Sequence, residues 1–315
     1  MPGDYDIEYC SPWAGADYSP FGKAGSIEAR LEQETWAPLA HLAANVPEAG
    51  IHFEKARSYT CKKDVDSTNP WYKDTVPDFR VLSPEELPSG TDSGIEYTSV
   101  CINVALYLPY LVGQCRKYGV VLKRGILKHI TEARSCHHSG QTADIVINCT
   151  GLMASKLGGV EDKSLTPARG QTVLVREDSK LLVGVSEAID NPEERLYFMN
   201  RASGGGTVLG GSYQLGNWES QPDLNLAMRI MDRVVKLHPE LADGKGVAGL
   251  SIIRHAVGLR PYRKGGVRLE KERTETGWVV HNYGHAGYGY QTSYACAAVV
   301  SNLVKEIVEN RTSKL

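Results

Sequence analysis

The segment that decides the fold is WVVHNYGHAGYGYQT, residues 278–292. Its first residues, 278–282, predict a β-strand, and the apolar spacing after it predicts a last helix over residues 292–309. Between them, Gly284, Gly287 and Gly289 permit close backbone approach to a ligand, and the helix would point free N–H groups and a partial positive charge there. A strand-to-helix turn that merely needs glycine explains the same pattern, so both interpretations stay open on these residues alone.

Outward from this segment, helices and apolar strands alternate near both ends of the chain, whereas the middle has the pattern of antiparallel strands. Helices are predicted from Ser26 onward, from Ser99 to about Gly119 and over residues 223–237, and strands over residues 120–122, 144–149, 172–176, 196–199, 207–212 and 267–271. Residues 57–94 are polar and rich in proline, which predicts a long connection with short strands. An α/β sheet that brackets an antiparallel insert suggests two interleaved domains with a cleft between them.

The composition is that of a folded, nearly neutral protein. Of 315 residues, 42% are hydrophobic and 23% charged, and 35 basic against 37 acidic residues leave a net charge of −2. This balance gives no electrostatic reason to expect a nucleic acid or an anionic membrane as partner. No apolar run reaches the roughly 18 residues of a membrane-spanning helix, because the most apolar stretch, residues 104–112, contains Pro109.

Both ends of the sequence bear on location. The first residues, MPGDYD, lack the basic and apolar parts of a signal peptide, and seven scattered cysteines favour a reducing compartment over a disulfide framework. The last three residues, Ser313-Lys314-Leu315, are a peroxisomal address that an import receptor reads. We therefore expect the peroxisomal matrix as location and the import receptor as a partner.

Arg260 is the main candidate for binding a small anion. The following residue, Pro261, disfavours a helix at Arg260, and a guanidinium can take a carboxylate through two parallel bonds, although a surface ion pair is the alternative. Three other sequence patterns are weaker evidence for a functional site. Gly244, Gly246 and Gly249 spell G-x-G-x-x-G but follow a helix, the reverse of a dinucleotide site. Cys136-His137-His138 lacks a second ligand pair at zinc spacing, so we expect no metal, and no G-x-S-x-G elbow occurs.

Taken together, these stretches resemble the fungal D-amino-acid oxidases, which are FAD-dependent flavoenzymes, over nearly the whole chain. The matching stretches are SPWAGA (11–16), NCTG (148–151), RGQ (169–171), LGGSY (209–213), RH (254–255) with GLRP (258–261), and HNYG (281–284) through Gln291. The resemblance implies transfer of the α-hydrogen of a D-amino acid as hydride to flavin N5. The imine would then hydrolyse to a 2-oxo acid and ammonia, while O2 reoxidises the flavin and yields hydrogen peroxide, which suits a peroxisomal address.

The resemblance also implies site residues. Arg260 would bind the substrate carboxylate, Tyr213 and Tyr197 would help to hold it, and Gln291 would lie near the flavin and the substrate amine. The implied FAD-binding residues are Ala14, Gly15 and Ala16 along the flavin ring, Gly151 beside the adenosine half, and Gly287 and Gly289 at the N1–C2 edge with Tyr288, Tyr290 and Gln291 beside them. Such a reaction depends on orientation more than on acid–base groups.

The implied fold is α/β, an α+β arrangement of two domains. A truncated Rossmann-like FAD-binding domain over residues 1–25, 95–170 and 255–315 would interleave with an antiparallel-sheet substrate-binding domain over residues 26–94 and 171–254. Family members begin with a strand, a G-x-G-x-x-G turn and a helix that hold the FAD pyrophosphate. Met1 matches a point after this unit, so we expect an incomplete gene model or a short form that binds FAD weakly.

Two other functions stay open at this point. A D-aspartate oxidase shares most of the motifs and would need a further cation in the pocket, which Arg195 or Arg201 could supply. A non-catalytic remnant without the FAD pyrophosphate site is the other alternative. The sequence leaves open which D-amino acid is preferred and whether the chain forms a homodimer.

Overall fold

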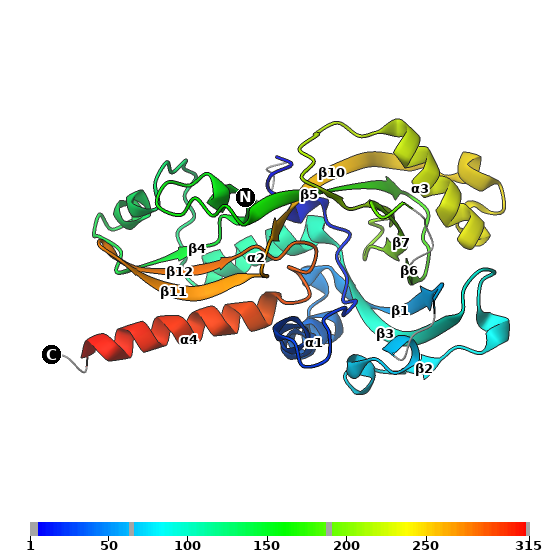
Figure 1. Ribbon diagram of the computed structural model, residues 1–315, viewed down its shortest axis with the longest axis horizontal. Helices are drawn as coiled ribbons and strands as arrows, with labels where there is room; N and C mark the ends of the chain where they lie inside the picture. The colour runs from blue at the N-terminus through cyan, green and yellow to red at the C-terminus, as the bar shows by residue number, and fades with distance from the viewer. Residues whose placement is uncertain (1–5, 63–65, 187–190, 313–315) are drawn as a thin grey trace.

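The computed structural model describes residues 6–62, 66–186 and 191–312, and two β-sheets lie side by side in it (Figure 1). The larger sheet has the strand order β10-β5-β8-β7-β6-β1-β3-β2, with β9 paired to β5, and the smaller has the order β11-β12-β4. The strands are β1 (Ile51–Thr60), β2 (Arg80–Val81), β3 (Ser93–Ile102), β4 (Ile145–Asn148), β5 (Leu165–Val175), β6 (Leu182–Ser186), β7 (Glu194–Asn200), β8 (Thr207–Ser212), β9 (Gln214–Leu215), β10 (Ile252–Arg263), β11 (Arg268–Thr274) and β12 (Gly277–Tyr283).

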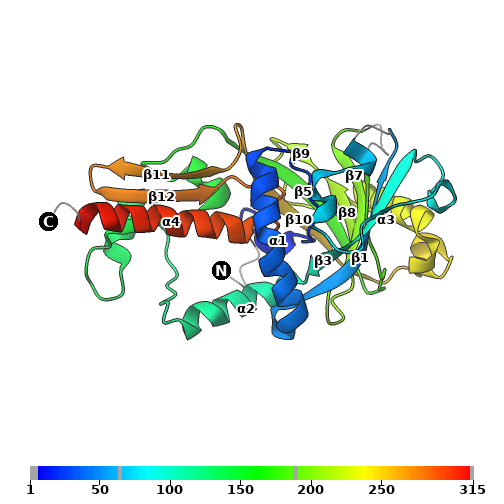
Figure 2. The ribbon, with the colours of Figure 1, turned by 90° about the horizontal axis from the view of Figure 1, so that it is seen from below.

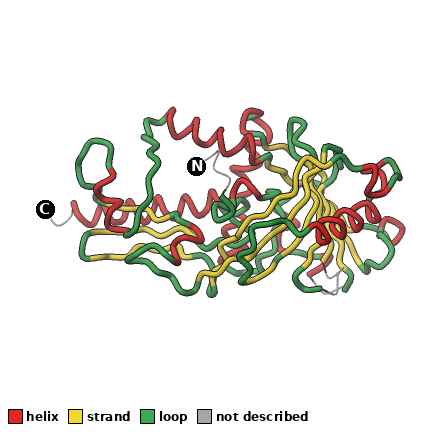
Figure 3. Tube along the Cα trace, turned by 90° about the horizontal axis from the view of Figure 1, so that it is seen from above, coloured by secondary structure: helices red, strands yellow, loops and turns green. Residues whose placement is uncertain are grey.

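The pairing within the sheets confirms the expected mixed α/β class. Neighbouring strands of the larger sheet run antiparallel except β1 and β6, and in the smaller sheet β12 is antiparallel to β11 but parallel to β4. Figure 3 shows the strands of the larger sheet gathered toward one end of the molecule and the smaller sheet toward the other. The exact domain boundaries stay a prediction.

The described residues contain four α-helices: α1 (Ile27–Asn45), α2 (Val104–Lys117), α3 (Leu224–Leu237) and α4 (Ser293–Thr312). Helix α1 starts where predicted, because the Ser26 hydroxyl accepts a hydrogen bond from the backbone N–H of Ala29 at 3.1 Å. It lies at the junction of the two sheets, beside the first turns of α4 (Figure 2). Helix α3 confirms the helix predicted over residues 223–237; Asp223 caps it, and it packs on the larger sheet.

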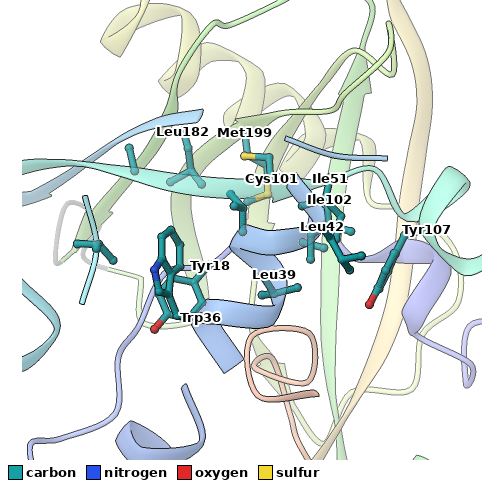
Figure 4. Close-up of a cluster of buried hydrophobic side chains, with 14 of the residues drawn as sticks. Tyr18, Trp36, Leu39, Leu42, Ile51, Cys101, Ile102, Tyr107, Leu182 and Met199 are labelled. Carbon is teal, nitrogen blue, oxygen red and sulfur yellow. The ribbon is translucent and has the colours of Figure 1, made fainter. Parts of the chain in front are cut away.

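The main core lies between α1 and the strands β1 and β3 (Figure 4). The residues that the figure labels are Tyr18, Trp36, Leu39, Leu42, Ile51, Cys101, Ile102, Tyr107, Leu182 and Met199. Burying a large apolar side chain contributes roughly 1.5–3 kcal/mol, so this cluster fixes α1 and the chain before it against the sheet. The smaller sheet has its own core, where Val300 and Ile307 of α4 pack on Val280 of β12.

The structure corrects three expectations about the elements. Ser99 does not open a helix: it belongs to β3, whose last residue pairs with Ile51 of β1, and α2 begins only at Val104. The side chain of Asn103 accepts from the N–H of Ala105 and provides the cap instead. Residues 120–122 are not a strand, and residues 57–94 are not only a connection with short strands, because they contain the end of β1 and the start of β3.

Two further expectations concern sequence patterns. The G-x-G-x-x-G match ends in a short 3₁₀ turn, Gly246–Gly249, between α3 and β10, so the structure confirms that it is not a strand–turn–helix motif. Within the described residues, no helix is long and apolar enough to cross a lipid bilayer.

Candidate active site

A cavity of about 1800 Å³ is lined by residues from both sheets and from the segment before α1. Ligand pockets usually measure about 300–1,000 Å³, so this one has room for a large cofactor and a substrate together. Every site residue expected from the sequence lines it: Ala14, Gly15, Ala16, Gly151, Tyr197, Tyr213, Arg260, Gly287, Tyr288, Gly289, Tyr290 and Gln291. Their individual roles stay predictions.

Arg260 lies on β10 and faces the cavity. Its strand conformation agrees with the expectation from Pro261, and its Nη1 donates to the backbone oxygen of Ser212 at 3.0 Å. The guanidinium carbon lies 5.3 Å from the centre of the Tyr213 ring. No carboxylate among the described residues pairs with Arg260, so its charge is available to an anionic ligand in the cavity.

A glycine lies in the sheet beneath each of Arg260 and Tyr197. A Cβ at Gly170 would lie 2.2 Å from Nη1 of Arg260, and one at Gly210 would lie 1.9 Å from Cζ of Tyr197. Both side chains therefore rest directly on the backbone of the larger sheet. Burial raises the pKa of Tyr197, although the charge of Arg260 opposes that shift, so its phenol is a neutral hydrogen-bond donor near neutral pH.

The glycine-rich segment between β12 and α4 forms another wall. A Cβ at Gly287 or Gly289 would have no heavy atom nearer than 3.6 or 3.5 Å, so the bare backbone of this wall is open to a ligand. The Tyr290 hydroxyl donates to the backbone oxygen of Ser11 at 3.0 Å and ties this wall to the segment before α1. Burial lowers the pKa of His285 to about 4, so its ring is neutral at physiological pH.

The segment before α1 runs along the edge of β3. The N–H of Ile102 donates to the oxygen of Ala16 at 2.9 Å, and the N–H of Tyr18 donates to the oxygen of Val100 at 3.0 Å. Between them lies Asp17, a cavity residue that the sequence reasoning missed; burial raises its pKa to about 6. Ser19 donates to the Asp17 carboxylate through its hydroxyl.

The two arginines considered for an acidic substrate lie in different places. Arg195 lines the cavity, with its guanidinium carbon 5.7 Å from the centre of the Tyr213 ring. Arg201 is buried at 4% exposure and its Nη2 donates to the backbone oxygen of Ala14 at 2.8 Å, so it supports the segment before α1.

Three comparisons relate this chain to known proteins. The model of a family described as DAO, FAD dependent oxidoreductase, matches residues 8–303. A D-amino-acid oxidase of Fusarium vanettenii is 52% identical over 100% of this chain and 90% of that protein, and a D-amino-acid oxidase of Schizosaccharomyces pombe is 37% identical over 94% of this chain and 84% of that protein. A solved glycine oxidase from Geobacillus kaustophilus has a TM-score of 0.74 over 94% of this chain and 84% of its own, at 18% identity, which shows the fold alone.

The fold and the family match define an FAD-dependent oxidoreductase, and FAD is accordingly its cofactor. Together with the identity to the fungal oxidases over the full chain, they show that the chain belongs to the D-amino-acid oxidase family. The residues present fit a flavin: the cavity is large enough, a Cβ at Gly151 would meet no atom within 4 Å, and one at Gly287 or Gly289 would meet none nearer than 3.5 Å.

Proposed function

We propose that this chain oxidises D-amino acids to 2-oxo acids, with release of ammonia and hydrogen peroxide. The observation that carries the proposal is Arg260, a guanidinium without a carboxylate partner among the described residues, in a cavity that is large enough for FAD and a substrate. The 52% identity to a fungal D-amino-acid oxidase over the full chain supports the same conclusion.

The chain's own residues bind and orient the substrate. Arg260 takes the α-carboxylate through two parallel bonds, while the hydroxyls of Tyr197 and Tyr213 donate to the same carboxylate. FAD, held by the expected residues 14–16, 151 and 287–291, would supply the acceptor for the substrate's α-hydrogen and its electron pair, and O2 would take up the two electrons to give hydrogen peroxide. Fixing the carboxylate holds the α-carbon in one place, and such orientation supplies much of the rate of a transfer between two bound groups.

Neither alternative function is favoured. Arg195 is the only one of the two candidate arginines that lines the cavity, and it lies on its exposed rim while donating to the backbone oxygens of Pro192 and Glu194. Because this side chain is exposed to water, an ion pair between it and an acidic substrate would contribute only about 0–1 kcal/mol. Membership of an oxidoreductase family speaks against a non-catalytic remnant.

A single spectroscopic experiment tests the function. The purified chain is incubated with excess FAD, freed of unbound cofactor and mixed anaerobically with D-alanine or, as a matched control, L-alanine. We expect the visible flavin band to be retained, to bleach with D-alanine and to persist with L-alanine. A chain that retains no flavin, or a band that does not bleach with D-alanine, would contradict the proposal.

The proposed location is the peroxisomal matrix. Ser313-Lys314-Leu315 lies outside the described residues, so the proposal rests on the tripeptide itself and on the peroxide that the reaction would release. A fluorescent protein fused before residue 1 should reach peroxisomes, and removing the last three residues should leave it diffuse in the cytosol. Equal distributions of the two fusions would disprove the address.

A further inference from the structure

We propose that Glu32 is a positioning residue, which holds Gln291 and the chain segment of residues 19–22 in place at the active site. The inference rests on the proposed function and concerns a residue that does not itself line the cavity. Glu32 lies on the buried face of α1 with 0% exposure. Its carboxylate joins two separate walls of the cavity, as the following contacts show.

The first contact fixes Gln291. Its Nε2 donates to Oε1 of Glu32 at 2.6 Å, and its Oε1 accepts from the backbone N–H of Ser19 at 3.1 Å. Both ends of the amide are therefore engaged, and the side chain has one orientation in the cavity wall. The same serine donates its hydroxyl to Asp17, which extends the network to a second cavity residue.

The second set of contacts fixes the adjoining wall, which residues 19–22 form. Oε1 of Glu32 accepts from the N–H of Phe21 at 3.3 Å, and Oε2 accepts from the N–H of Gly22 at 3.1 Å. Trp71 holds the same turn from its other side, because its Nε1 donates to the oxygen of Gly22 at 2.7 Å. The ring of Phe21 then lies 5.3 Å from that of Tyr288, centre to centre, where the two walls meet.

Only a carboxylate satisfies this arrangement. Three N–H donors approach Glu32 from both sides, and no cation among the described residues pairs with it. A glutamine there has a single acceptor oxygen, so its NH2 group would face an N–H and leave at least one buried donor unpaired. Leucine would remove every acceptor. Glu32 is thus a buried acid in an otherwise apolar helix face, where an apolar residue would pack more simply. Its contacts give it a positional role.

The test is a double-mutant cycle with Glu32→Gln and Gln291→Ala, measured as the dissociation constant of FAD and as kcat/KM for D-alanine. Glu32→Gln alone should lower kcat/KM about 10- to 100-fold, the usual effect of losing a hydrogen bond to a charged group. In the Gln291→Ala background its effect should shrink at least about fivefold, because residues that act through each other are not additive. Glu34→Gln, on the exposed side of the same helix, is the matched control and should change neither quantity.

The outcomes separate positioning from general support of the fold. An effect of Glu32→Gln that is the same in both backgrounds would overturn the proposal, as would unchanged FAD binding and kcat/KM. If Glu32→Gln does not fold, Glu32→Asp, which keeps the charge but withdraws it by one methylene, replaces it in the cycle. Should the wild type bind FAD without oxidising D-alanine, the proposed function fails, and the cycle on FAD binding still decides the role of Glu32.

Discussion

Replacing Arg260 by alanine is expected to lower kcat/KM for D-alanine by about 10³-fold, because two charge-assisted hydrogen bonds to the substrate carboxylate are lost. The loss is large because Arg260 lies over the Tyr213 ring without a carboxylate partner among the described residues, whereas Arg263, another arginine of the cavity, is paired with Asp162 at 2.8 Å. Oxygen consumption at varied D-alanine concentration measures the effect.

Two variants sharpen this result. Arg260→Lys keeps the positive charge but not the planar fork, so it should recover only a small part of the lost activity. Arg273→Ala removes an exposed arginine of β11 that does not line the cavity, and it should leave kcat/KM unchanged. Activity of Arg260→Ala within about tenfold of the wild type would mean that the carboxylate is bound elsewhere in the cavity.

Local sequence signals predicted those parts of the fold that depend on neighbouring residues. Ser26 caps α1 as predicted, because a side-chain oxygen within reach of free N–H groups favours the start of a helix, and the helix predicted over residues 223–237 is α3. By contrast, the sequence predicts that Ser99 opens a helix, whereas it lies in β3. Strand β3 forms by pairing with β1, whose residues lie far away in the sequence. Pairing of this kind leaves no local pattern that distinguishes a buried strand from the first turn of a helix.

The site divides in the same way. The residues that the matching motifs indicated all line one cavity, although the roles assigned to them stay predictions. The residues behind them were missed, because their importance depends on contacts across the fold. For Glu32 a signal existed: it lies three residues after Ala29 and four before Trp36, an acid within the apolar face of α1. For Gly170 the signal was its place in the matching stretch RGQ (169–171), which does not indicate that Arg260 lies on this glycine.

Gly170→Ala is expected to lower kcat/KM for D-alanine about 100-fold while the folded protein stays nearly as stable as before. The added Cβ would lie 2.2, 2.5 and 2.6 Å from Nη1, Cζ and Nη2 of Arg260, so the guanidinium has to move. That group is the far end of a flexible side chain and can swing away at little energetic cost. The backbone of Gly170 lies within β5, opposite Gly258, and has no left-handed φ that alanine would resist.

Stability and activity should therefore respond differently, and that contrast identifies the mechanism. Thermal unfolding of Gly170→Ala should shift by no more than about 2 °C, whereas a buried clash with rigid groups would cost several times more. Gly113→Ala is the matched control: its Cβ would meet no atom within 4 Å on α2, so activity should be unchanged and stability slightly higher.

The decisive comparison is the double variant Gly170→Ala/Arg260→Ala. If Gly170 matters only because it leaves room for the guanidinium, adding Gly170→Ala to Arg260→Ala should cost no further activity, since the group that would be displaced is already gone. A further loss of tenfold or more would show instead that the new methyl group obstructs the cavity itself. Equal activities of Arg260→Ala and Gly170→Ala/Arg260→Ala would establish that the bare strand backbone at Gly170 is the surface on which Arg260 is held.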